Sequence, residues 1–201
     1  MWKPILKGLS QKGLIRNDTI ANIDKSCCTS TQVVLDFDFA KEEVCKLLKI
    51  STPKSADCLY YNKNNNSLYF IEMKDLTSTM EEIRNKGFID TADINEFLAI
   101  KLDSFKIHDK IFDSYMTSLL LLSAIGTKPS DYKKYLNREN LKIHFILLVK
   151  ASSSDYLKYR LSILGLLKRY SFRAFSTPQV NLIRSDDLDM FISQLNAPPS
   201  I

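Results

Sequence analysis

Three consecutive segments decide the fold: KSADCLYY at residues 54–61, NKNNN at 62–66 and SLYFIEMKD at 67–75. The outer two are rich in aromatic and aliphatic residues and the middle one is polar, which is typical of a β-hairpin. Three charged residues interrupt this pattern: Asp57 begins the first strand, and Glu72 and Lys74 end the second. Charged side chains are rare on core strands unless they are paired or bind a ligand. The hairpin is therefore a candidate for a catalytic or ligand-binding site.

The register of the hairpin determines whether these charges meet. Opposed residues in an antiparallel pair have a constant sum of residue numbers. If Asn62 pairs with Ser67, Asp57 lies opposite Glu72 and residues 63–66 form a four-residue loop. Because side chains alternate between the two faces of a strand, Lys74 then shares a face with both carboxylates. A slip of one residue would separate them.

Two carboxylates placed side by side repel each other unless a cation lies between them. Oxygen ligands suit Mg²⁺ or Mn²⁺, which keep positions open for water and phosphate. Asp57 and Glu72 are therefore candidate metal ligands. Lys74 is a candidate catalytic residue, which would stabilise charge on a reacting phosphate or help to orient and deprotonate an attacking water. Glu43, beside the apolar face of a preceding helix, is a further candidate ligand, directly or through water.

At these residues the chain resembles the PD-(D/E)XK nuclease superfamily. Ala56-Asp57 stands at the "PD" position, with Ala in place of Pro, and Glu72-Met73-Lys74 stands at the "ExK" position. Glu43 matches the acid often found on the family's first helix, and the resemblance covers residues 35–151. It implies a restriction endonuclease-like core, a mixed β-sheet flanked by helices. It also implies Mg²⁺-dependent hydrolysis of phosphodiester bonds, with DNA as the expected partner, in a repair, restriction or anti-phage defence system.

Other interpretations stay open beside this one. Glu72 and Lys74 would also be explained by a solvated pair on an edge strand, worth under about 1 kcal/mol. The same fold would also serve a catalytically silent subunit that docks a partner protein. Lys101 interrupts the apolar stripe of a long helix, where it would reach a phosphate at the site or extend to solvent.

The rest of the chain predicts an α/β protein with a helix-covered sheet. Residues 33–38 begin extended and turn helical from Phe39, with Asp38 as the expected N-cap. The near-continuous apolar run at 141–151 is typical of a central strand covered on both faces. The helix expected at 156–170 places Leu157, Leu161, Leu164 and Leu167 inside. Residues 76–86 are expected as a polar helix or a lid. Further helices are expected at 94–105, at 111–125 after a break near residues 108–109, and at 186–195, with short strands at 172–176 and 180–184.

Composition bounds the remaining possibilities. A chain of 201 residues suits one domain, here expected at 32–201 with residues 1–31 as an N-terminal arm packed on it. The net charge of +5 is compatible with a nucleic-acid partner. Five glycines and no glycine-rich loop argue against P-loop and dinucleotide-binding proteins.

The cysteines and the apolar runs predict the environment of the protein. Cys27, Cys28, Cys45 and Cys58 form no CxxC pair, so free thiols in a reducing interior are expected. The longest apolar run, 119–125, is too short to cross a bilayer. We therefore expect a cytoplasmic protein with no membrane partner.

Overall fold

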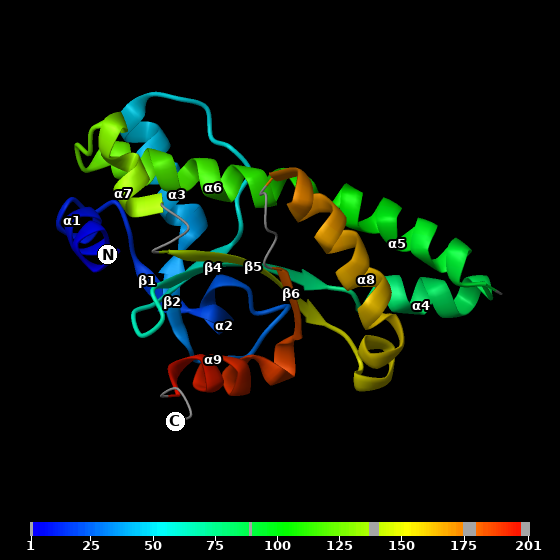
Figure 1. The fold of residues 1–201 in the computed structure, drawn as a ribbon. Helices are drawn as coiled ribbons and strands as arrows, with labels where there is room; N and C mark the ends of the chain where they lie inside the picture. The colour runs from blue at the N-terminus through cyan, green and yellow to red at the C-terminus, as the bar shows by residue number, and fades with distance from the viewer. Residues whose placement is uncertain (1, 89, 137–140, 175–179, 198–201) are drawn as a thin grey trace.

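A mixed six-stranded sheet runs through the middle of the molecule and carries helices on both faces (Figure 1). The computed structural model describes residues 2–88, 90–136, 141–174 and 180–197. The strands follow one another across the sheet in chain order. Those from β1 to β4 are antiparallel, whereas β4, β5 and β6 are parallel. The strands are β1 Asn17–Thr19, β2 Val33–Asp36, β3 Cys58–Asn62, β4 Ser67–Asp75, β5 Lys142–Lys150 and β6 Val180–Arg184.

The helices lie on the two faces of this sheet. In Figure 1, α2 and α9 cover one face, and α3, α6 and α8 lie over the other. Parallel strands need a crossover, which α4 to α7 supply between β4 and β5, and α8 between β5 and β6. The helices are α1 Lys3–Gln11, α2 Ile20–Ile23, α3 Phe37–Leu48, α4 Thr77–Lys86, α5 Thr91–Ser104, α6 Ile107–Ala124, α7 Tyr132–Leu136, α8 Ser153–Ala174 and α9 Leu188–Asn196.

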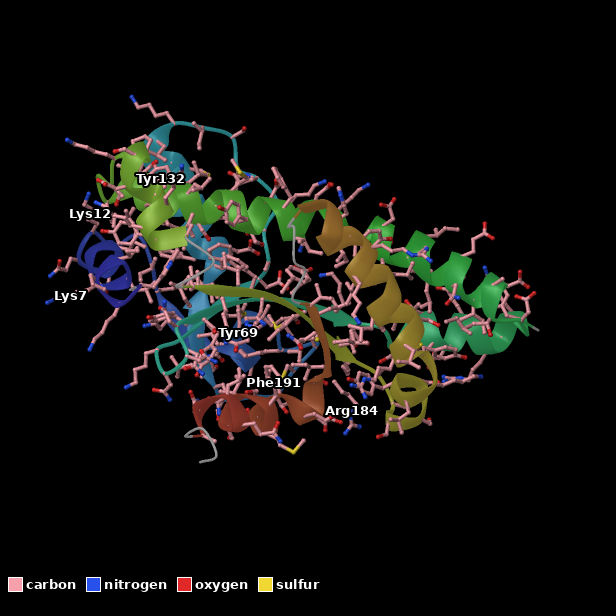
Figure 2. The ribbon with its side chains drawn as sticks, viewed as in Figure 1. Lys7, Lys12, Tyr69, Tyr132, Arg184 and Phe191 are labelled. Carbon is pink, nitrogen blue, oxygen red and sulfur yellow. The ribbon has the colours of Figure 1, made fainter. Side chains whose placement is uncertain are left out.

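Each face of the sheet has its own apolar core. On β4, Leu68 and Phe70 pack into the larger core beneath α3, α6 and α8, and the alternate residue Tyr69 packs into the smaller one. Tyr69 lies near Phe191 of α9, with ring centroids 6.3 Å apart at 85° (Figure 2). Because side chains alternate, Glu72 falls on the face of the larger core.

The expected central strand is confirmed. Phe145 and Leu147 of β5 enter the larger core, and Ile146 and Leu148 enter the smaller one. Both faces of β5 are therefore covered, which explains why its sequence is apolar almost without interruption.

The expected N-terminal arm contains α1, β1 and α2. β1 pairs with β2 at the edge of the sheet, and Ile5 and Leu9 of α1 are buried in the larger core. The indole Nε1 of buried Trp2 donates a hydrogen bond to the carbonyl of Tyr135 at 3.0 Å. The beginning of the chain is thus part of the sheet and of its core.

Two expected helix boundaries are wrong. The N-cap of α3 is Asp36, whose Oδ1 accepts the backbone N–H of Phe39 at 2.9 Å, so the helix begins two residues earlier than expected from Asp38. The break before α6 lies at Lys106, which has a left-handed φ of 57°, and the helix already includes His108 and Asp109.

The end of the chain also differs from expectation. α8 extends through residues 172–174, where a short strand was expected, and residues 175–176 lie outside the described residues. Leu157 and Leu161 are 69% and 79% exposed, although both were expected inside. Leu167 is buried as expected, and the other buried residues of α8 include Tyr159, Ile163 and Leu166. The apolar residues of this helix form two stripes, and packing buries only one of them.

Candidate functional site

The hairpin has the predicted register. Five pairs run from Asn62 opposite Ser67 to Cys58 opposite Ile71, so the next position in line places Asp57 beside Glu72. Asp57 itself precedes β3, and its backbone carbonyl accepts the N–H of Phe37 at 3.0 Å. Its carboxylate Oδ2 accepts the N–H of Met73 at 2.7 Å. The loop entering the hairpin and the neighbouring strand together hold the Asp57 side chain.

Glu72 lies at the bottom of the site and is 0% exposed. Its Oε1 is 2.5 Å from Nζ of Lys74, and that ammonium group also donates to the carbonyl of Met73 at 2.8 Å. Glu72 Oε2 is buried and has no hydrogen-bond partner among the described residues. A buried carboxylate oxygen without a hydrogen-bond partner is energetically costly, so Oε2 is a candidate ligand atom for a cation.

A second lysine completes the group. Lys110, in the first turn of α6, places its Nζ 2.7 Å from Glu72 Oε1 and 3.7 Å from Asp57 Oδ1. The candidate site is therefore two carboxylates and two ammonium groups, Asp57, Glu72, Lys74 and Lys110, hereafter the four-charge cluster. Sequence reasoning missed Lys110. One available signal is that it lies between buried Ile107 and Ser114 at helical spacing, a charge on an inward face.

Burial and mutual repulsion govern the protonation of the carboxylates. Burial, with the neighbouring Asp57 charge, raises the pKa of Glu72 to about 7. Burial also raises the pKa of Asp57, although Lys110 opposes the shift. Burial by itself lowers the pKa of Lys110, but the negative charges of Glu72 and Asp57 outweigh this effect and raise it. The ammonium groups thus compensate carboxylates that water cannot solvate.

Glu43 and Lys101, two of the predicted site residues, are paired elsewhere. Glu43 forms an ion pair with Lys46 of the same helix at 2.7 Å. Lys101 of α5 binds Glu82 of α4 at 2.9 Å. No described contact brings either residue to Asp57 or Glu72. The acid of α3 whose charge acts on Asp57 and Lys110 is Asp38, which also accepts a hydrogen bond from Ser55 Oγ at 3.2 Å.

The two carboxylates suit a hard divalent ion, of which the protein would supply only some of the ligands. Among the described residues, no three His, Cys, Asp or Glu side chains form a group suited to a metal. Asp57 and Glu72 supply two carboxylates, one of which has the unpartnered Oε2. Mg²⁺ commonly binds through one or two carboxylates and takes its other ligands from water and substrate phosphate. The pair is consistent with that mode of binding.

The structure also bears on the expectations for the cysteines and for membrane-spanning segments. All four cysteines are free and buried, as expected. None of the helices in the described ranges combines the length and apolar character needed to cross a bilayer.

Comparison of the chain with protein-family models, with curated proteins and with solved structures found no match.

Proposed function

We propose that this protein is a metal-dependent nuclease that hydrolyses phosphodiester bonds, with DNA as its substrate. The observation that carries the proposal is the meeting of Asp57, Glu72 and Lys74 on one face of the hairpin, with Glu72 Oε2 buried and unpartnered. The resemblance of these residues to the PD-(D/E)XK pattern supports the same conclusion. The net charge of +5 favours an anionic substrate.

Each residue has a distinct role in this proposal. Asp57 and Glu72 hold the ion, Mg²⁺ or Mn²⁺, which when bound supplies Lewis-acid polarisation of the phosphate and an activated water. Lys74 offers a fixed positive charge two residues after Glu72, suited to orienting that water or stabilising negative charge at phosphorus. Because Glu72 is fully buried, the low local dielectric strengthens these interactions relative to water.

A cleavage assay tests the proposal. The protein is incubated with linear, circular and single-stranded DNA and with RNA, in Mg²⁺, Mn²⁺ or EDTA. Lys74→Met and Asp57→Asn are assayed beside it, with Asp131→Asn, which alters a partly exposed ion pair with Lys134, as a control. We expect metal-dependent cleavage by the wild type and the control, and a loss of about 100-fold or more in both site variants. Cleavage of circular DNA would identify an endonuclease.

A catalytically silent subunit that docks a partner protein is the second candidate, and the position of Lys110 favours it. Its ammonium group at 2.7 Å from Glu72 already neutralises the carboxylates, as in a buried structural ion network. This function predicts no cleavage under any metal condition and no measurable Mn²⁺ binding by the wild type. Identical behaviour of the wild type and both site variants in the DNA assay would contradict the nuclease proposal.

A further inference from the structure

We propose that Lys110 is an exchangeable counter-ion of the four-charge cluster: its ammonium group lies between Asp57 and Glu72 when no divalent ion is bound, and the ion binds by displacing it. This inference rests on the proposed metal-dependent function and concerns the regulation of that site. The affinity of the site for the ion would then depend on Lys110 of α6 as well as on the hairpin carboxylates.

The two lysines make different contacts. Lys110 Nζ is within 4 Å of both carboxylates, at 2.7 Å from Glu72 Oε1 and 3.7 Å from Asp57 Oδ1. Lys74 Nζ contacts Glu72 Oε1 and the Met73 carbonyl and lies 5.8 Å from the centroid of the Phe105 ring. A divalent ion shared by Asp57 and Glu72 would compete with Lys110 for the space between them, and Lys74 would keep its carbonyl partner.

Charge balance argues for displacement. Two carboxylates and two ammonium groups have no net charge, so adding a divalent ion with both lysines in place leaves two uncompensated positive charges at a site where Glu72 is 0% exposed. Withdrawing one ammonium group removes half of that excess and the closest repulsion. Uncompensated charge is costly where water is excluded.

The position of Lys110 on its helix allows the movement. It lies in the first turn of α6, beside the partly exposed His108 and Asp109, and its own side chain is 18% exposed. A lysine has a flexible four-carbon stem, so its ammonium group reaches solvent by rotation about side-chain bonds, without movement of the backbone. An anionic substrate would meet the released charge on that side.

Lys110→Met is the direct test, because it removes the charge and keeps an unbranched apolar chain. Mn²⁺ affinity is measured by calorimetry and electron paramagnetic resonance, and thermal unfolding is followed with and without Mn²⁺, all in the absence of DNA. We expect the variant to bind Mn²⁺ about tenfold more tightly or better and to gain more in Tm from the ion than the wild type. Lys134→Met, which removes an exposed lysine paired with Asp131, should match the wild type.

The outcomes separate this inference from the proposed function. Equal Mn²⁺ affinity and equal Tm gain in wild type and Lys110→Met would overturn the exchange, and metal-dependent DNA cleavage by that same wild type would leave the nuclease proposal standing. Absence of Mn²⁺ binding in every variant would overturn both.

A measurement on the wild type keeps the inference testable if Lys110→Met does not fold. The side-chain ammonium signals of ¹⁵N-labelled lysine are followed by nuclear magnetic resonance during a Mg²⁺ titration, with Lys110→Arg to assign the Lys110 signal. We expect a signal protected by the ion pairs without Mg²⁺ and its loss to solvent exchange at saturation. A Lys110 signal that stays unchanged while Mg²⁺ binds would overturn the exchange.

Discussion

The carboxylate of Asp57 accepts the backbone N–H of Met73 at 2.7 Å, so a side chain continues the hydrogen bonding of the hairpin beyond β3. Oδ2 makes this contact, while Oδ1 faces Lys110 at 3.7 Å. One carboxylate oxygen therefore stabilises the fold, and the other faces Lys110 within the four-charge cluster. This division allows the structural role of Asp57 to be separated from its proposed chemical role.

Asp57→Asn and Asp57→Ala should differ in stability and agree in activity. The amide oxygen of Asn still accepts the Met73 N–H, whereas Ala leaves that donor without a partner, so we expect Asp57→Ala to be less stable than Asp57→Asn by about 1–2 kcal/mol. Both should lose cleavage, because neither retains a carboxylate for the ion. Urea unfolding and the DNA assay measure the two effects. Equal stability of the two variants would contradict the structural role of Oδ2.

Asp36 should contribute more to stability than Asp38. Asp36 is buried, caps α3 through the Phe39 N–H, and accepts hydrogen bonds from Arg16 Nε at 2.9 Å and Nη2 at 2.5 Å. We expect Asp36→Ala to cost about 2 kcal/mol, from a lost cap and a lost charge-assisted pair. Asp38→Ala, which removes an acid paired with Lys41, should cost under about 1 kcal/mol. Chemical denaturation of both variants measures the two losses of stability. A larger loss for Asp38→Ala than for Asp36→Ala would contradict the assignment of Asp36 as the N-cap.

Two glycines should respond to alanine in opposite directions. A Cβ at either Gly165 or Gly87 would meet no atom within 4 Å, so crowding does not distinguish them. Gly165 lies inside α8, where Ala should stabilise the protein by about 0.5–1 kcal/mol. Gly87 ends α4 with φ of +60°, where Ala should cost about 1 kcal/mol. Thermal unfolding of the two single variants checks both signs.

His144 should make stability depend on pH below neutrality. It stacks on Tyr69 with ring centroids 4.5 Å apart, its Nε2 is buried and has no hydrogen-bond partner in the part of the chain that the structure describes, and burial lowers its pKa to about 4. The unfolded chain, with a pKa near 6.5, takes up this proton first. Stability from neutral His144 is therefore fully present above about pH 6.5 and is lost as the pH falls toward about 4.

The test is the slope of unfolding free energy against pH. Allowing for partial solvent exposure, we expect His144 to account for a loss of about 1–2 kcal/mol across that window. His144→Phe keeps an aromatic ring and should remove the His144 part of the slope between pH 6.5 and 5. The part due to Glu72, whose pKa of about 7 also makes stability depend on pH in this range, stays the same in both proteins. An unchanged slope in His144→Phe would show that another group is responsible.

Local patterns were sufficient where the interaction partners lie close in the chain. The hairpin register followed from a polar loop between two apolar strands, because pairing fixes opposed residues once one pair is known. The buried strand β5 followed from its unbroken apolar run. The burial of α8 did not follow, since Leu157 and Leu161 have the same local periodicity as a buried stripe. Only the packing of the sheet, α5 and α6 against α8 decides which stripe is covered.

The sequence by itself determined that Glu72 and Lys74 share one face, because side chains on a strand alternate with a period of two. Asp57 joins them in the register that pairs Asn62 with Ser67, which the sequence predicted and the structure confirmed. Only the tertiary structure brought Lys110 to them, since the position of α6 over the sheet depends on how α3, α5 and α8 fill the larger core. Glu43, in contrast, pairs with Lys46 three residues later on the same helix, a contact that helical spacing alone provides. Contacts within a hairpin are set by local geometry, whereas contacts from a distant helix are set by packing of the whole core.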